Sequence, residues 1–286
     1  MSMPEAEAGT ARQVFTIEHT RRQEDPDNAP DLLADLSGLS KLRVKDAMTK
    51  GAVWLCRDGR KPERMRRATT PLKAGDRVNL YYDSGVLGLT PPLATLVADR
   101  RRYSVWHKPA GLLVEGSRFG DHATLATQIA KHFDPRREVY LVHRLDLEAS
   151  GLIIAAHSRQ AAAKLSALFQ ARAVDKRYRI EVRGDLRPRG EHGRIELPLD
   201  DKPAITEYRL DSYTEADDRS VVNVKMLSGR HHQIRRHFDA IGHPVIGDPR
   251  YGQGNKDPLG MRLMASGIAF TDPWSRQIVS FGEPPD

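Results

Sequence analysis

The first periodic pattern of apolar residues begins about thirty residues into the chain. Leucines at positions 32, 33, 36 and 39 recur with helical spacing, which predicts a helix from Asp31. Ser40 can cap a second helix, and Gly51 can end it. Residues 1–30 are mostly polar and show no period, so we expect a flexible N-terminal tail there.

Strand patterns follow the two helices. Ala52–Cys56 is apolar enough for a strand, Asp58-Gly59 is typical of a hairpin turn, and a further strand is predicted after Gly75-Asp76. Residues 31–83 are therefore expected to form a small α+β domain, of an ordinary size for one. Residues 84–100 contain two glycines and two prolines and are expected to be a linker.

The remaining residues, 101–286, are predicted to form one larger domain. Helical patterns occur near Ala123–His132, Ser158–Arg172 and His231–Ile241. Strand patterns are more numerous and occur at Tyr103–Trp106, Gly151–Ala156, Arg177–Arg183, Thr206–Tyr213 and Ser220–Leu227. Because strands and helices do not alternate strictly, we expect an α+β fold with a mixed or antiparallel central sheet and flanking helices.

Composition narrows the functional classes. The chain has 286 residues, of which 39% are hydrophobic and 29% charged, as in ordinary globular proteins. No apolar run is long enough to cross a membrane and no signal peptide is evident, so we expect a cytoplasmic protein. The single cysteine, Cys56, cannot form an internal disulfide or a thiolate metal cage. The net charge of +7 favours a polyanionic partner, with RNA ahead of DNA or anionic lipid.

The most informative segment runs from Val142 to Ala156. A polar loop with adjacent His, Arg and Asp leads directly into a wholly apolar strand, which suggests that the strand is buried on both faces. Asp146 would then lie at the floor of a cleft, where loops on a rigid sheet usually carry function. A buried carboxylate needs a cationic partner, or it becomes protonated.

Two later segments supply side chains that could meet Asp146. The alternation in Arg177–Arg183 places Tyr178 on the apolar face of its strand. Helical geometry places Arg235 at the border of an apolar helix face, from which its guanidinium can reach inward. Taken alone, an Asp–Arg pair is more often a structural ion pair, and an inward tyrosine is more often a core residue.

The motifs together resemble one family. The run HRLDLEASGL from His143 resembles the His-Arg-Leu-Asp-x-x-Thr-Ser-Gly-Leu signature of the RluA-type RNA pseudouridine synthases. The turn Lys108-Pro109-Ala110-Gly111, the element Lys176-Arg177-Tyr178 and the segment Ser228–Gly252 resemble that family's other motifs, in the family's order. The resemblance implies that Asp146 is the catalytic carboxylate, Tyr178 stacks on the target uracil and Arg235 pairs with Asp146. It also implies that Arg144 enters the RNA stack when the target base flips out.

The smaller domain resembles the S4 family of RNA-binding modules. The resemblance rests on the basic second helix followed by Gly-Ala-Val and on the later Leu-Lys-Ala-Gly-Asp-x-Val, within residues 31–83. It implies that the RNA-binding cations include Lys41, Arg43 and Lys45. A packing module with a solvated basic helix is the plainer interpretation. An S4-like module favours a large structured RNA, and hence ribosomal RNA over transfer RNA.

The implied reaction fits these residue types. Isomerisation breaks the bond between ribose C1′ and uracil N1 and rejoins the uracil through C5, so neither a redox cofactor nor a metal is required. A carboxylate near C1′ suits the positive charge that develops on the sugar, as in glycoside cleavage. The chain departs from the family pattern at Ala149, where threonine is usual, at His231, and in the run Arg262–Ser266. We expect these departures to bear on loop dynamics, rate and RNA target more than on reaction type.

Other functions were weighed against this prediction. Histidines at 231, 232, 237 and 243 suggest a metal site, but the first two diverge on a helix and no acidic or cysteine cluster completes a cage. The run His-Arg-Leu-Asp is similar to the catalytic loop of protein kinases, but the sequence contains neither their glycine-rich loop nor their Asp-Phe-Gly element. A non-catalytic RNA-binding or ribosome-assembly factor and a DNA-base glycosylase remain alternatives. We expect no cofactor, no membrane partner and a monomer.

Overall fold

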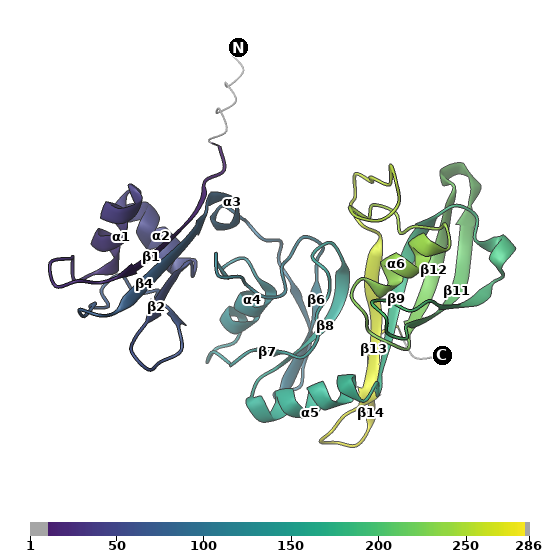
Figure 1. The fold of residues 1–286 in the computed structure, drawn as a ribbon. Coiled ribbons are helices and arrows are strands. Elements are labelled where there is room, and N and C mark those ends of the chain that lie inside the picture. The colour runs from purple at the N-terminus through teal and green to yellow at the C-terminus, as the bar shows by residue number, and fades with distance from the viewer. Residues whose placement is uncertain (1–10, 284–286) are drawn as a thin grey trace, which may run out of the picture. The chain divides into compact units, whose positions relative to one another are not determined.

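The structure is a computed structural model that describes residues 11–283. Within these residues the chain divides into two compact units, one of residues 11–91 with 115–127 and one of residues 92–114 with 128–283. Figure 1 shows the helices and strands of both units with their labels. No helix among the described residues is long and apolar enough to cross a membrane.

The smaller unit is a four-stranded antiparallel sheet with two helices packed on one face (Figure 1). Its strands, in the order β1-β4-β2-β3, are β1 (Val14–Thr20), β4 (Arg77–Asp83), β2 (Val53–Cys56) and β3 (Glu63–Arg64). Its helices are α1 (Ala29–Ser37), α2 (Lys41–Thr49) and the short α3 (Ser84–Leu87). Ser40 caps α2 as expected, because its hydroxyl accepts a hydrogen bond from the amide of Arg43.

The N-terminal boundary of the smaller unit differs from the sequence-based expectation. Residues Val14–Thr20, expected within a flexible tail, form β1 and pair with β4 along its whole length. Phe15 and Ile17 pack against the core of the unit, but two inward apolar residues on an edge strand give only a weak sequence signal. The part of the expected tail at residues 1–10 lies outside the described residues.

The expected linker also contains regular structure. Residues 84–100 include α3 and the strand β5 (Thr95–Asp99). Residues 115–127 contribute to the smaller unit rather than to the larger one. Asp121 forms ion pairs with Arg64 at 3.1 Å and Arg66 at 2.6 Å, which ties this segment to the small sheet.

The larger unit contains a ten-stranded mixed sheet with flanking helices, so the predicted fold class is confirmed. The main strand order is β10-β11-β12-β9-β13-β8-β6-β5, with β14 paired to β13 and β7 paired to β8. The strands not yet given are β6 (Tyr103–Lys108), β7 (Tyr140–Leu141), β8 (Ser150–Ala156), β9 (Val174–Arg183), β10 (His192–Glu196), β11 (Ile205–Thr214), β12 (Arg219–Met226), β13 (Leu263–Thr271) and β14 (Ile278–Gly282). The remaining helices are α4 (Leu125–His132), α5 (Arg159–Gln170) and α6 (Gln233–Ala240).

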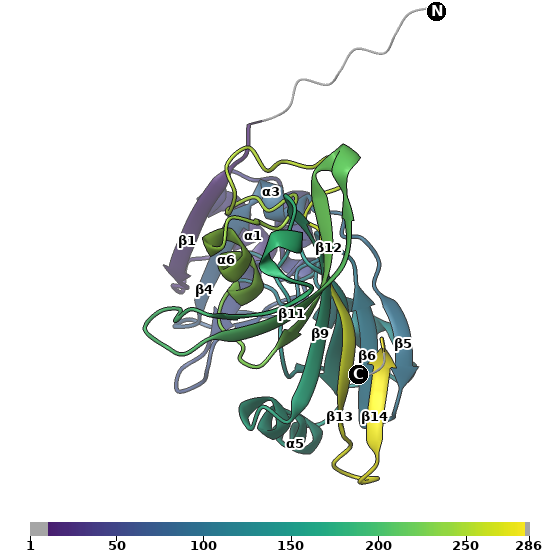
Figure 2. The ribbon, with the colours of Figure 1, turned by 90° about the vertical axis from the view of Figure 1, so that its right-hand side faces the viewer.

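Strands β8 and β13 lie side by side near the centre of this sheet. Strand β8 is buried at six of its seven residues, as its apolar sequence predicts. It runs parallel to β13, whereas the other pairings in the sheet are antiparallel. Helix α6 lies beside β11 and β12 (Figure 2). Its residues Ile234 and Phe238 belong to the core cluster that β9, β11 and β12 also form. The loop before β8, the face of β9 and helix α6 therefore meet in one region.

Candidate active site

The loop that carries Asp146 is anchored at both ends. Leu145 is buried in the core, and the ring of His143 accepts a hydrogen bond of 2.9 Å from the amide of Ile154 in β8. Burial, with a smaller effect of Lys176, lowers the pKa of His143 to about 3, so this ring stays neutral and can accept that bond. At Gly151 a Cβ would lie 2.3 Å from a carbonyl oxygen of β13, so only glycine permits the close approach of the two strands.

Asp146 and Arg235 are in direct contact. The guanidinium of Arg235 in α6 donates a hydrogen bond of 2.8 Å to the carboxylate of Asp146. The Arg235 side chain is 1% exposed, whereas that of Asp146 is 22% exposed. Arg235 is thus held inside the protein, and it fixes the partly accessible carboxylate of Asp146 at the pocket.

A second carboxylate, Asp248, fixes the arginine from its other side. It accepts hydrogen bonds of 2.6 and 2.7 Å from the Arg235 guanidinium, and its side chain is 0% exposed. It also accepts from the backbone amides of Arg250 at 2.8 Å and Tyr251 at 3.1 Å. Asp248 lies within the segment Ser228–Gly252 that resembles the family, but the sequence analysis assigned no role to it. An acid in a turn between buried Ile246 and a tyrosine was the available signal.

Arg235 and Asp248 stabilise each other's charged forms. Burial alone would lower the pKa of Arg235, but the hydrogen bonds of Asp248 and Asp146 outweigh it and raise that pKa. Burial would likewise raise the pKa of Asp248, but the Arg235 guanidinium and the two amides hold it below its usual range. Arg235 therefore stays cationic and Asp248 anionic at neutral pH.

Tyr178 faces the same pocket as Asp146. It lies on the apolar face of β9, as predicted, and packs against the core beneath α6. Asp146, Tyr178 and Arg235 line one small hollow of about 90 Å³. Burial, and secondly the Asp146 carboxylate, raise the pKa of the Tyr178 phenol, so the phenol stays protonated at neutral pH.

The small hollow adjoins a wider pocket of about 820 Å³, because the two share six lining residues. Arg144, Asp146 and Tyr178 line both. The Arg144 side chain is exposed, so it is accessible to a ligand in the wider pocket. The three predicted catalytic residues and the predicted intercalating arginine thus lie together.

His232 is a further residue of the pocket that sequence reasoning missed. It adopts a left-handed conformation with φ +52° just before α6, and its ring stacks on that of His231. Its Nε2 lies 3.7 Å from the Asp146 carboxylate and its Nδ1 lies 3.2 Å from the Tyr251 hydroxyl. Burial lowers the pKa of His232 despite the attraction of Asp146.

The expectation that His231 and His232 diverge on a helix is wrong, because both residues precede α6 and their rings stack on each other. The other two histidines of the suggested metal site have separate partners. His237 contacts Thr206 and a carbonyl, and His243 contacts the carbonyl of Arg183. Among residues 11–283, no three His, Cys, Asp or Glu side chains form a group that could hold a metal ion. Ala149, one of the departures from the family pattern, is 1% exposed and packs in the core beside the loop that carries Asp146.

The predicted RNA-binding cations of α2 are only partly available. Lys41 forms an ion pair of 2.8 Å with Asp31. Arg43 donates hydrogen bonds to the Tyr82 hydroxyl and to the side chain of Gln13. Lys45 is exposed and, within the part of the chain that the structure describes, makes no such contact.

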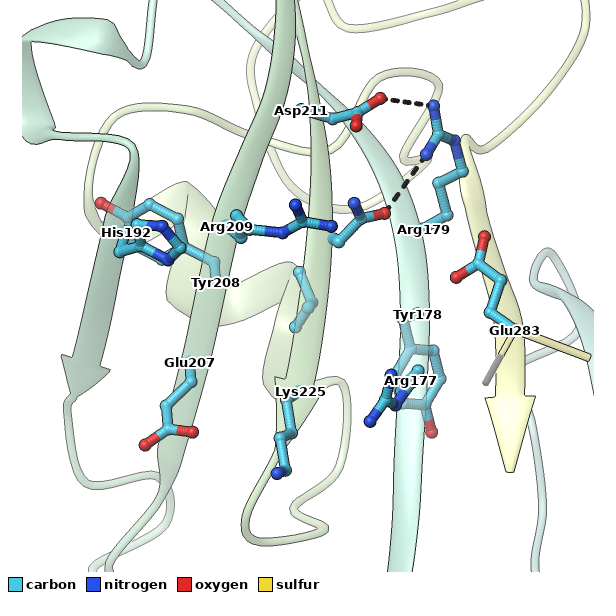
Figure 3. Close-up of a pocket in the computed structure, with 12 residues that line it drawn as sticks. Arg177, Tyr178, Arg179, His192, Glu207, Tyr208, Arg209, Asp211, Lys225 and Glu283 are labelled. Atoms are coloured by element: carbon cyan, nitrogen blue, oxygen red, sulfur yellow. Dashed lines mark hydrogen bonds and ion pairs between the residues drawn. The ribbon is translucent and has the colours of Figure 1, made fainter. Parts of the chain in front are cut away.

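A second hollow of about 700 Å³ lies on the opposite face of the sheet, where the alternate residues of β9 point (Figure 3). Its charges are largely matched within the protein. Arg179 donates hydrogen bonds to Asp211 at 2.8 Å and to Asn223 at 3.3 Å, and Glu207 and Glu283 also line it. Asp146 and Arg235 do not line this hollow, so we place the candidate active site on the other face.

The sequence and fold of this chain are similar to those of a known class of enzymes. The family model described as RNA pseudouridylate synthase matches residues 102–240. The solved structure of human RNA pseudouridylate synthase domain containing 1 aligns with a TM-score of 0.58 and 25% identity, over 69% of this chain and 86% of that chain.

Relatives in bacteria refine the class. The dual-specificity RNA pseudouridine synthase RluA of Escherichia coli K12 is 33% identical over 64% of this chain and 89% of its own length. An RNA pseudouridine synthase of Aquifex aeolicus is 30% identical over 74% of this chain and 72% of its own. The ribosomal large subunit pseudouridine synthase D of Nitrosomonas europaea is 33% identical over 68% of this chain and 62% of its own. The chain belongs to the RluA-type RNA pseudouridine synthases, which makes it an isomerase that converts uridine to pseudouridine in RNA.

Proposed function

We propose that this enzyme isomerises uridine in ribosomal RNA and that Asp146 is its catalytic carboxylate. The observation that carries the proposal is the hydrogen bond of 2.8 Å between Asp146 and the buried Arg235, in a pocket that also contains Tyr178. An isolated surface ion pair would not explain a partly exposed carboxylate held by a guanidinium that is itself 1% exposed.

The chemistry follows from this geometry. Cleavage of the C1′–N1 bond leaves positive charge on the ribose, which the Asp146 carboxylate can stabilise or capture. Direct attack at C1′, attack at C6 of uracil and elimination to a glycal all remain open to such a carboxylate. The detached uracil turns, C5 bonds to C1′, C5 releases its proton and N1 gains one. Arg235 holds the carboxylate in one rotamer throughout.

We assign Tyr178 to stacking rather than to proton removal. Its raised pKa keeps the phenol protonated, so it cannot accept the C5 proton without first losing its own. Its ring is large enough to hold a free uracil in the pocket between cleavage and recombination. Extruding the uridine costs a few kcal/mol of unstacking, and we infer that Arg144 offsets part of this by filling the vacated place in the RNA.

Ribosomal RNA is proposed as the substrate on two grounds. One bacterial relative is named as a ribosomal large subunit enzyme. The smaller unit, which we interpret as an S4-like RNA-binding domain, carries the basic helix α2 with Lys41, Arg43 and Lys45. We infer that this helix contacts RNA phosphates chiefly through Lys45, whose ammonium is exposed.

The test compares Asp146→Asn with the wild type by tritium release from RNA labelled at C5 of uracil. Ribosomal and transfer RNA from a strain that lacks the enzyme serve as parallel substrates. Asp211→Asn is the matched control, because Asp211 also pairs with an arginine but lies on the opposite face of the sheet. We expect release only from ribosomal RNA, and none with Asp146→Asn. Undiminished release with Asp146→Asn would refute the catalytic assignment, and release from transfer RNA alone would refute the substrate.

A further inference from the structure

The wider pocket beside Asp146 carries more positive charge than the protein neutralises. Five cations line it, against the two carboxylates of Asp146 and Asp175. Asp146 is paired with Arg235, and Asp175 with Arg177 and Lys225. The other lining cations are Arg144, Arg172, Lys176 and Arg230, none of which has a carboxylate partner among residues 11–283.

Lys176 is partly buried, whereas Arg144 and Arg172 are exposed. It lies two residues before Tyr178 on β9, so both side chains project from the same face of the strand. Its ammonium lies close to the loop between β12 and α6, because a Cβ built on Gly229 would be 3.4 Å from the Lys176 Nζ. Burial, and secondly Arg172, lower the pKa of Lys176. Both effects oppose the charged form and are relieved by an anion.

A purely structural role would leave a different pattern of contacts. Lys108, a buried lysine of the same unit, donates hydrogen bonds of 3.1, 3.0 and 3.2 Å to the carbonyls of Pro109, Leu112 and Leu147. The Lys176 ammonium has no hydrogen bond or ion pair within the described residues. The ammonium is not fully enclosed, so it can be reached from the pocket. An ammonium that opens onto the pocket and makes no contact within the described residues can bind an anionic ligand there.

We propose that Lys176 binds a backbone phosphate of the RNA next to the uridine that enters the pocket, with Arg172 beside it. This inference rests on the proposed function, because it needs RNA in this pocket. A nucleotide whose base reaches Tyr178 must bring its flanking phosphates into the mouth of the same pocket. A phosphate oxygen accepts charge-assisted hydrogen bonds from an ammonium and a guanidinium together. Lys176 thereby acts as a positioning residue and does not touch the reacting atoms.

The test measures RNA affinity over a range of salt concentrations, together with the single-turnover rate at saturating RNA. For Lys176→Met we expect about tenfold weaker binding at low salt, as for loss of one charge-assisted hydrogen bond. The slope of log affinity against log salt should become smaller by about one. The saturated rate should be nearly unchanged, because the contact is equal in the ground and transition states. Lys176→Arg should restore affinity and slope.

The matched control is Lys225→Met, which removes the same charge from the same pocket. The Lys225 ammonium already lies 3.6 Å from the Asp175 carboxylate, so we expect little change in the salt slope. An equal loss of slope in both variants would show a general field rather than a bound phosphate and would overturn the proposal. Wild-type affinity in Lys176→Met would also overturn it.

Failure of the proposed function is distinguishable from failure of this inference. If the wild type released no tritium from any RNA, the assignment of the reaction would fail before the lysine variants were compared. If Lys176→Met did not fold, Lys176→Gln would take its place in the same assays. A slower saturated rate with wild-type affinity in either variant would contradict phosphate binding, because it would place Lys176 in the chemical step.

Discussion

The buried ion pair between Asp248 and Arg235 gives the sharpest prediction of stability. Asp248→Asn keeps the size of the side chain but replaces an acceptor oxygen by an amide group that faces the guanidinium. Two of the hydrogen bonds to Arg235, of 2.6 and 2.7 Å, depend on this carboxylate. Both side chains are almost completely buried, so solvent cannot replace the lost partner. Removal of one partner from such a pair costs about 3–5 kcal/mol.

The assay is urea unfolding of wild type and variant, followed by tryptophan fluorescence, with the free energy of unfolding taken at zero urea. Asp211→Asn is the control, because it breaks a pair with Arg179 in which both side chains are more than a third exposed. That change should cost less than about 1 kcal/mol. A similar small cost for both variants would refute the view that Asp248 is the main support of Arg235.

The effect on catalysis should be separate from the effect on folding. With Asp248 neutral, Arg235 retains the carboxylates of Asp146 at 2.8 Å and of Glu148 at 3.9 Å, and its rotamer and that of Asp146 are less restricted. We expect the single-turnover rate of the folded fraction to fall about a hundredfold, since a displacement of about 1 Å can have that effect. A folded Asp248→Asn protein with the wild-type rate would show that Arg235 does not need the Asp248 carboxylate for catalysis.

Three further predictions test other parts of the account. Tyr178→Phe should retain the single-turnover rate within about tenfold, because a protonated phenol is not the base, whereas Tyr178→Leu should lose more; equal losses in tritium release would refute the stacking assignment. Burial lowers the pKa of Lys108 to about 8 from 10.5, so its charge penalises the fold below pH 8 and the penalty disappears as the pH rises to 10.5. The free energy of unfolding of the wild type should therefore rise over that range relative to Lys108→Met, and a constant difference would contradict this sign. Neutralising Lys45 alone should flatten the salt dependence of RNA binding by about one phosphate contact, and adding changes at Lys41 and Arg43 should do little more, because both already have partners. An unchanged slope would show that α2 does not contact phosphate.

Much of the active site could be read from sequence because its residues lie in regular patterns. The alternation around Tyr178 and the helical position of Arg235 each determine a direction, and the apolar run after Asp146 determines burial. The close contact of Asp146 with Arg235 joins residues 89 positions apart. Only the family resemblance, and not the local pattern, predicted that contact.

The features missed by sequence reasoning depend on contacts made after folding. Strand β13 is rich in small residues and shows no alternation, yet it is the neighbour of both β8 and β9. Asp248 resembles an ordinary turn residue until its partner is known. The assignment of residues 115–127 to the smaller unit follows from ion pairs of Asp121 with arginines more than fifty residues earlier. No local period records such pairs.

The most direct test of the account is an experimental structure with RNA in which the target uridine carries fluorine at C5. Fluorine cannot leave C5 as a proton, so the reaction should stop before its last step. We predict that the uracil lies against the Tyr178 ring, with C1′ or C6 beside the Asp146 carboxylate and Arg235 still hydrogen bonded to it. A uridine bound in the hollow lined by Arg179 and Asp211, or a carboxylate of Asp146 turned away from the nucleoside, would contradict the assignment.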